Sequence, residues 1–104
     1  MEELERYRSF VHECGYEHGG RYVDMLGNTD YETGDIYYGR YKVVTTMDEF
    51  MEAAGFKTER TAVKMYKQLI KHGLLTRDFK MTNINRRQYD MIRNLICFLS
   101  KGDN

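Results

Sequence analysis

The sequence contains no proline, so it has no Pro-rich linker. Only two cysteines are present, Cys14 and Cys97, which is more typical of reduced thiols than of a disulfide framework. No apolar run approaches the ~20 residues that a membrane-spanning helix needs. The mixed charges of residues 1–10 are unlike those of a signal peptide. We therefore expect a soluble, cytoplasmic protein.

Catalytic motifs are absent as well. There is no phosphate-binding loop, no carboxylate pair at a telling spacing, and no histidine close to an obvious nucleophile. His12, Cys14 and His18 lie close together and could bind a metal with Cys97. Their spacing matches no zinc pattern, however, and Cys14 fits the apolar stripe of a helix. We expect no enzyme activity, no metal and no cofactor.

What the chain does contain is an ordinary globular composition with an uneven distribution of charge. Its 104 residues are 41% hydrophobic and 31% charged, which fits one domain covering residues 1–104. Residues 1–55 hold 5 Lys/Arg and 12 Asp/Glu, a net of −7, whereas residues 56–104 hold 11 and 4, a net of +7. This split indicates either two faces with different partners or two halves that attract each other within the fold.

The first half of the chain predicts one helix and two strands. Apolar residues at helical spacing indicate the helix, and Gly15 is a plausible stop for it. Tyrosine and valine are enriched in the second strand segment, where Gly39 marks a bend or bulge. The predicted elements are a helix over 4–14, a turn over 15–20, a strand over 21–26, an exposed loop over 27–35 and a strand over 36–44.

The second half predicts a helix-turn-helix, then a short strand with a charged turn, and then a last helix. Thr46 and Glu49 fit a capping box, and Gly55 ends the helix that starts there. Thr58 can cap the next helix, which Gly73 ends. The predicted elements are a helix-turn-helix over about 46–73 with helices at 46–54 and 59–72, a wing over about 74–82 and a C-terminal helix over about 85–100.

The second helix of this pair has one apolar and one basic side. On a helical wheel its lysines and Arg60 form one continuous stripe opposite the apolar residues. A helix fits the major groove of duplex DNA, where lysines suit phosphates and residues such as Arg60, Thr61 and Gln68 suit base edges. A solvated surface helix would show the same stripe. The candidate DNA-binding residues are Lys57, Arg60, Thr61, Lys64, Lys67, Gln68, Lys71, Arg77 and Lys80.

Residues 34–77, GDIYYGRYKVVTTMDEFMEAAGFKTERTAVKMYKQLIKHGLLTR, resemble the winged helix-turn-helix domains of phage replication initiators, replisome organisers and related phage regulators. The resemblance implies an α+β winged-helix fold with three to four helices and a small antiparallel sheet. It also implies a phage or prophage protein that binds double-stranded DNA in transcription regulation or as an accessory replication factor. The matching positions are Gly34, Gly39, Thr46, Gly55, Thr58, Thr61, Leu69, Gly73 and Leu74.

The last predicted helix has an apolar stripe that covers about half of its circumference. The stripe could pack on the first helix within one chain. Alternatively it could form a homodimer, which would present two recognition helices to two half-sites. The candidate dimerisation residues are Ile92, Leu95, Ile96 and Leu99.

A second function class also fits the sequence. The acidic first half carries a group of tyrosines, and aromatic residues are common anchors in protein interfaces. The alternative hypothesis is therefore a protein-interaction module that binds and inhibits a host factor. Acidic side chains near these tyrosines could mimic nucleic acid or dock on a basic partner; they are Asp24, Asp30, Glu32 and Asp35.

Overall fold

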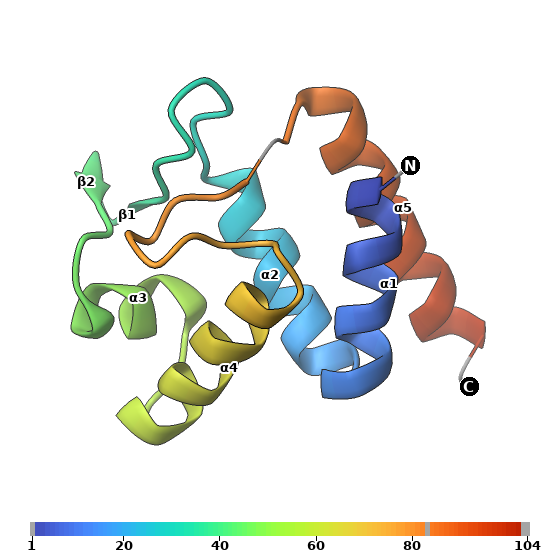
Figure 1. The fold of residues 1–104 in the computed structure, drawn as a ribbon, viewed down its shortest axis with the longest axis horizontal. Coiled ribbons are helices and arrows are strands. Elements are labelled where there is room, and N and C mark those ends of the chain that lie inside the picture. The colour runs from blue at the N-terminus through green and yellow to red at the C-terminus, as the bar shows by residue number, and fades with distance from the viewer. Residues whose placement is uncertain (1, 83, 103–104) are drawn as a thin grey trace.

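Among the residues that the structure describes, five helices and one short hairpin make up the regular structure of this α+β fold (Figure 1). The structure is a computed structural model, and it describes residues 2–82 and 84–102. Within these ranges no helix has an apolar stretch that could cross a bilayer. The elements are α1 (Glu2–Cys14), α2 (Tyr16–Gly27), β1 (Tyr37–Tyr38), β2 (Lys42–Val43), α3 (Met47–Ala54), α4 (Glu59–Lys71) and α5 (Arg86–Gly102).

The prediction of a turn over 15–20 and a strand over 21–26 is wrong, because α2 begins at Tyr16, directly after Gly15, and runs through Gly27. Gly19, Tyr22, Val23 and Leu26 are all buried, and their i, i+3, i+4, i+7 spacing places them on one face of the helix. A methyl group at Gly19 would lie 2.8 Å from Cγ2 of Val11 on α1. The glycine therefore allows α1 and α2 to approach closely, and this packing outweighs the low helix propensity of the segment.

The predicted strand over 36–44 is instead a tight hairpin. β1 and β2 pair antiparallel, with Tyr37 opposite Val43 and Tyr38 opposite Lys42. The chain reverses near Gly39, where the sequence predicts a bend. The preceding loop follows the prediction from residue 28 onward, and a bridge from Thr29 to Ile36 closes it.

The predicted helix-turn-helix is confirmed at the level of its two helices and the turn between them. The Thr46 Oγ1 accepts a hydrogen bond from the Glu49 amide over 3.2 Å, which starts α3. Gly55 ends that helix with a φ of 76°, in the left-handed region that glycine adopts without strain. Gly73 adopts a φ of 72° just after α4. Local sequence signals therefore set the bounds of this pair to within one or two residues.

Three short segments lie side by side next to α4 and extend the β-structure by isolated bridges. Leu75 bridges Met81, and Asp35 bridges Lys80, so residues 80–81 lie between the other two segments. The Met81 amide donates to the Gly34 carbonyl over 2.8 Å. The turn predicted within 74–82 thus exists and is joined to the loop before β1.

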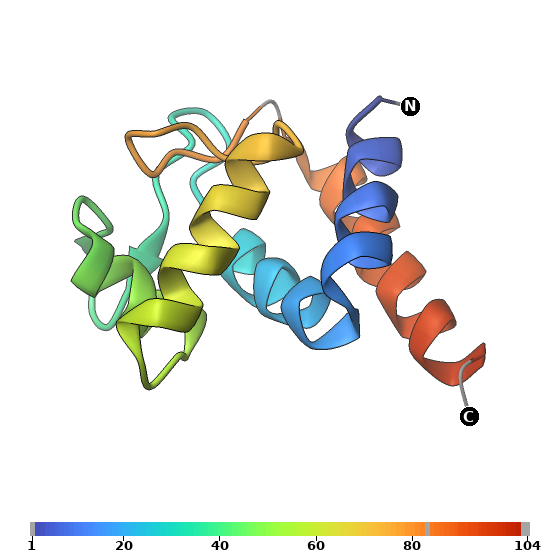
Figure 2. The same ribbon diagram turned by 60° about the horizontal axis from the view of Figure 1, so that its bottom comes forward.

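Helix α5 packs against α1 and α2 within the chain (Figure 2). Ile92 and Ile96 are 1% and 7% exposed and belong to the core, so their assignment to a dimer interface is corrected: the same chain already covers them. Leu95 and Leu99 are half-buried and pack against this core. Of the apolar side chains on α5, Phe98 is exposed.

Candidate nucleic-acid interface

The basic side of α4 faces outward. Figure 2 shows the helix at the front of the molecule, while Ala62, Met65 and Leu69 on its opposite side are fully buried. Because the core fixes this rotation of the helix, the row of cations lies in solvent along its length. The exposed cations are Arg60, Lys64, Lys67 and Lys71.

Arg21 on α2 contacts the turn between α3 and α4. The Arg21 Nη1 donates to the Ala54 carbonyl over 2.8 Å, which satisfies an acceptor in the last turn of α3. The same guanidinium lies 4.4 Å from the centre of the Phe56 ring. Phe50 on α3 is fully buried and its ring lies edge-on to Tyr66 of α4. These contacts fix the start of α4 relative to the rest of the fold.

One end of the cation row is engaged by an acidic residue of the first half. The Lys71 Nζ lies 2.7 Å from Oε1 of Glu13, and the His72 Nε2 lies 2.8 Å from Oε2 of the same carboxylate. The hydrogen bond from Lys71 is the main cause that lowers the pKa of Glu13. Within the described residues Arg60, Lys64 and Lys67 have no such carboxylate partner. The free part of the row is therefore its first three members.

The two uncharged residues predicted to face bases differ in access. Thr61 is exposed, and its hydroxyl lies 2.7 Å from the Thr58 hydroxyl and 3.0 Å from the Thr58 carbonyl. Gln68 is half-buried, and its Oε1 is covered by protein and has no partner among the described residues. In this orientation of the amide the Gln68 acceptor is not exposed, and its assignment as a base reader stays a prediction.

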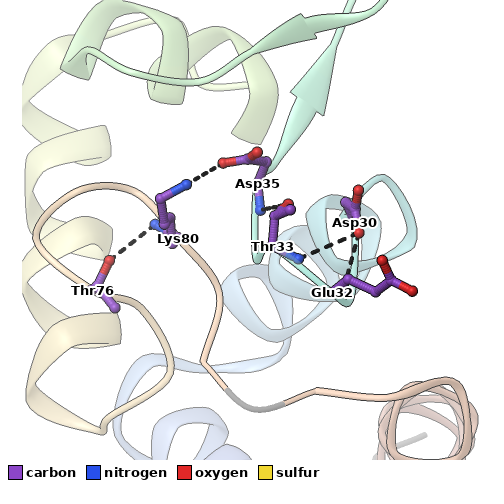
Figure 3. A network of polar contacts seen from close by, with 6 residues as sticks. All are labelled: Asp30, Glu32, Thr33, Asp35, Thr76 and Lys80. Carbon is purple, nitrogen blue, oxygen red and sulfur yellow. Dashed lines mark hydrogen bonds and ion pairs between the residues drawn. The ribbon is translucent and has the colours of Figure 1, made fainter.

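The two basic residues predicted at the wing also differ in how accessible they are. Arg77 is exposed at the turn, and its carbonyl accepts a hydrogen bond from the Tyr66 hydroxyl over 2.9 Å. Lys80 instead forms an ion pair with Asp35, in the loop before β1 (Figure 3). Its amide donates to Oγ1 of Thr76 over 3.1 Å. Lys80 thus holds the wing to the loop and is less available to DNA than predicted.

Aromatic rings join the wing to the helix pair. The Phe79 ring centre lies 5.0 Å from that of Tyr66 and 5.9 Å from that of Phe50. The Tyr66 hydroxyl bond to the wing adds a polar tie at the same place. Periodicity places Tyr66 on the apolar side of α4, but nothing in the sequence indicates that its hydroxyl reaches the wing.

The other sequence candidates occupy separate places. Lys57 is exposed in the turn before α4, at the entrance to the cation row. The His18 ring packs edge-on to Phe56, with centres 5.5 Å apart, and burial lowers the pKa of His18. In the described part of the chain no three potential metal ligands gather at one point.

The tyrosines of the first half also differ in access. Tyr31, Tyr37 and Tyr38 are half-buried. Tyr41 differs from these three, because its side chain is 93% exposed at the tip of the β1–β2 hairpin.

Comparisons of this chain with family models, with curated protein sequences and with solved structures give no match. Functional inference therefore depends on the geometry described above.

Proposed function

We propose that this chain is a winged-helix DNA-binding protein that places α4 in the major groove of duplex DNA. The observation that carries the proposal is the row of exposed cations on the second helix of a tight helix-turn-helix. A helix of this kind fits the major groove, and its cations face the phosphates on both walls. Three of them, Arg60, Lys64 and Lys67, have no carboxylate partner in the described residues.

The order of the β-segments supports the winged-helix assignment. A first segment at 34–36 precedes α3 and α4 in the chain. The two arms of the wing, at residue 75 and at residues 80–81, follow α4. The second arm, at 80–81, lies between the first segment and Leu75. Contacts of Tyr66 with Arg77 and Phe79 hold this segment next to α4, where Arg77 would contact the DNA backbone beside the groove. The resemblance of residues 34–77 to phage replication and regulatory domains supports a role as a regulator or accessory replication factor.

Each contact has an expected chemical role. Arg60 and Thr61 stand near the start of α4, where their donors and acceptors suit base edges. Lys64 and Lys67 suit phosphates, and Lys57 suits a phosphate at the entrance to the groove. Glu13 reduces the part that Lys71 plays, because it holds the ammonium group in an ion pair.

The experiment is a fluorescence-anisotropy titration with duplex DNA at two salt concentrations. The variant Lys64→Glu with Lys67→Glu should weaken binding strongly and lower the salt slope by about 2, since each phosphate contact contributes ~0.9. The control is Arg87→Glu with Arg93→Glu, which makes the same change of net charge at exposed positions on α5.

The control variant should bind duplex DNA like the parent. Equal affinity and an equal salt slope for the α4 variant and the parent would refute the assignment of this face. A parent that binds no duplex would favour the protein-interaction module instead.

A further inference from the structure

The tip of the β1–β2 hairpin displays an aromatic ring between two cations. Tyr41 is 93% exposed, and Arg40 and Lys42 beside it are also exposed. Neither cation forms an ion pair with a carboxylate in the described parts of the chain. The Lys42 Nζ lies 6.0 Å from the centre of the Tyr38 ring, and that ring remains half-buried. The tip is thus a positive, aromatic point on the acidic half of the molecule.

The hairpin turn places Tyr41 in a backbone conformation that bulky residues rarely adopt. Tyr41 has a φ of 60°, in the left-handed region where bulky residues are rare and glycine or asparagine is usual. Its ring makes so little contact with the fold that burial does not offset this strain. Residues that keep such strain cluster at binding sites. The position therefore suggests that the Tyr41 ring serves a contact outside the chain.

An open hollow lies at the foot of the ring. It has a volume of about 1170 Å³, and its walls come from the hairpin, from the end of α2 and from Asn28 and Thr29 just after that helix. Asp30 also lines it, but the Asp30 Oδ1 accepts backbone hydrogen bonds from Glu32 and Thr33 and so is engaged in the turn. The hollow is large enough for a planar ring to lie against Tyr41 with polar atoms nearby.

We infer that this hairpin tip is a binding site for single-stranded nucleic acid, in which Tyr41 stacks on an unpaired base and Arg40 and Lys42 contact the flanking phosphates. Stacking on a side chain requires a base whose face is free, and every nucleobase offers such a face once it leaves the duplex. The duplex bases are already stacked on one another, so the tip would select unpaired strands. The site goes beyond the duplex contact of α4, and the hairpin and α4 lie on different sides of α3 (Figure 1).

The test measures binding of a labelled oligothymidylate by fluorescence anisotropy, together with thermal unfolding. Tyr41→Asn should weaken binding by at least about fivefold, because base–aromatic stacking contributes ~1–3 kcal/mol. The same variant should unfold at the parental temperature or above it, since asparagine tolerates the left-handed region. Tyr41→Phe should keep most of the affinity. Phe98→Asn is the matched control, because it removes another exposed ring on α5.

One further variant distinguishes the proposed duplex site from the proposed single-strand site. Lys64→Glu with Lys67→Glu should keep oligothymidylate binding even where it loses the duplex, so failure of either proposal is visible on its own. Two results would overturn the single-strand site: a parent that does not bind oligothymidylate, and a Tyr41→Asn variant that binds it within about twofold of the parent. Either result would leave the tip as a candidate contact for a protein partner.

Discussion

Lys71 and Glu13 form an ion pair over 2.7 Å that joins the end of α4 to the end of α1. The pair links the basic and acidic halves of the chain, and it neutralises one cation of the row that we assign to DNA. Asp35 and Lys80 make a second link of this kind at the wing. Some of the opposite charges of the two halves therefore pair with each other within the fold. Arg60, Lys64 and Lys67 stay available for the proposed DNA contact.

The first prediction concerns this ion pair. Glu13→Gln should bind duplex DNA about two- to fivefold more tightly and raise the salt slope by about 0.9, because Lys71 becomes free for a phosphate. Anisotropy at two salt concentrations measures both quantities. Glu5→Gln makes the same change of net charge at an exposed position on α1, and it should leave the slope unchanged. Equal behaviour of the two variants would show that general charge, not Lys71, is responsible.

The second prediction concerns the contact between the wing and the loop before β1. A methyl group at Gly34 would lie 2.6 Å from the Met81 carbonyl oxygen, and the φ of Gly34 is 81°. Gly34→Ala should lower the free energy of unfolding by ~2–4 kcal/mol, since it adds a backbone clash to the strain of a positive φ. Urea unfolding measures this loss.

Gly39→Ala is the matched control for Gly34→Ala. Gly39 also has a positive φ, of 57°, but a methyl group there meets open space. The control should therefore cost only ~1 kcal/mol. If both variants lose the same stability, the close approach of the wing to the loop is not present in solution.

The third prediction concerns pH. The Tyr38 hydroxyl donates to Oε2 of Glu49 over 2.5 Å, and the Thr45 amide donates to Oε1 over 2.8 Å. The bond from Tyr38 is the largest cause that lowers the pKa of Glu49 to about 2, and the same bond raises the pKa of Tyr38 to about 12. A lowered carboxyl pKa stabilises the folded state above the unfolded-state value, and this stabilisation is lost as pH falls.

The parent should therefore lose stability between about pH 4.5 and pH 2 as Glu49 becomes protonated. Glu49→Gln should be less stable than the parent at pH 7 and should lose less stability over this acid range. Urea midpoints measured from pH 7 to pH 2 give both curves. Parallel curves for the two proteins would mean that Glu49 does not carry the lowered pKa.

The bounds of α3 and α4 could be predicted well because the sequence features that set them act locally. Thr46 and Gly55 lie at the ends of α3, and each acts on backbone groups within a few residues. Helix α2 was not predicted because Gly19 is a poor helix former when considered alone. The buried spacing of Gly19, Tyr22, Val23 and Leu26 is helical, so the correct period was present in the sequence.

Whether a candidate cation forms an ion pair within the fold was much less predictable. Lys71 meets Glu13 across 58 positions of the chain, and Lys80 meets Asp35 across 45. Helical periodicity could assign Lys71 to an outer face, but no pattern in the sequence indicates which carboxylate the fold brings to either lysine. The same limit applies to Ile92, whose apolar neighbours on α1 and α2 are known only once the helices are packed.

The contacts among the rings of Phe50, Tyr66 and Phe79 have a mechanical consequence. They join α4 to residues 75–81, so under the proposed DNA contact the distance between a groove contact and a backbone contact would be set before the protein meets the duplex. A duplex of unsuitable width would then have to deform to fit the protein. Sequences that bend or narrow easily would be favoured even at base pairs that no side chain touches.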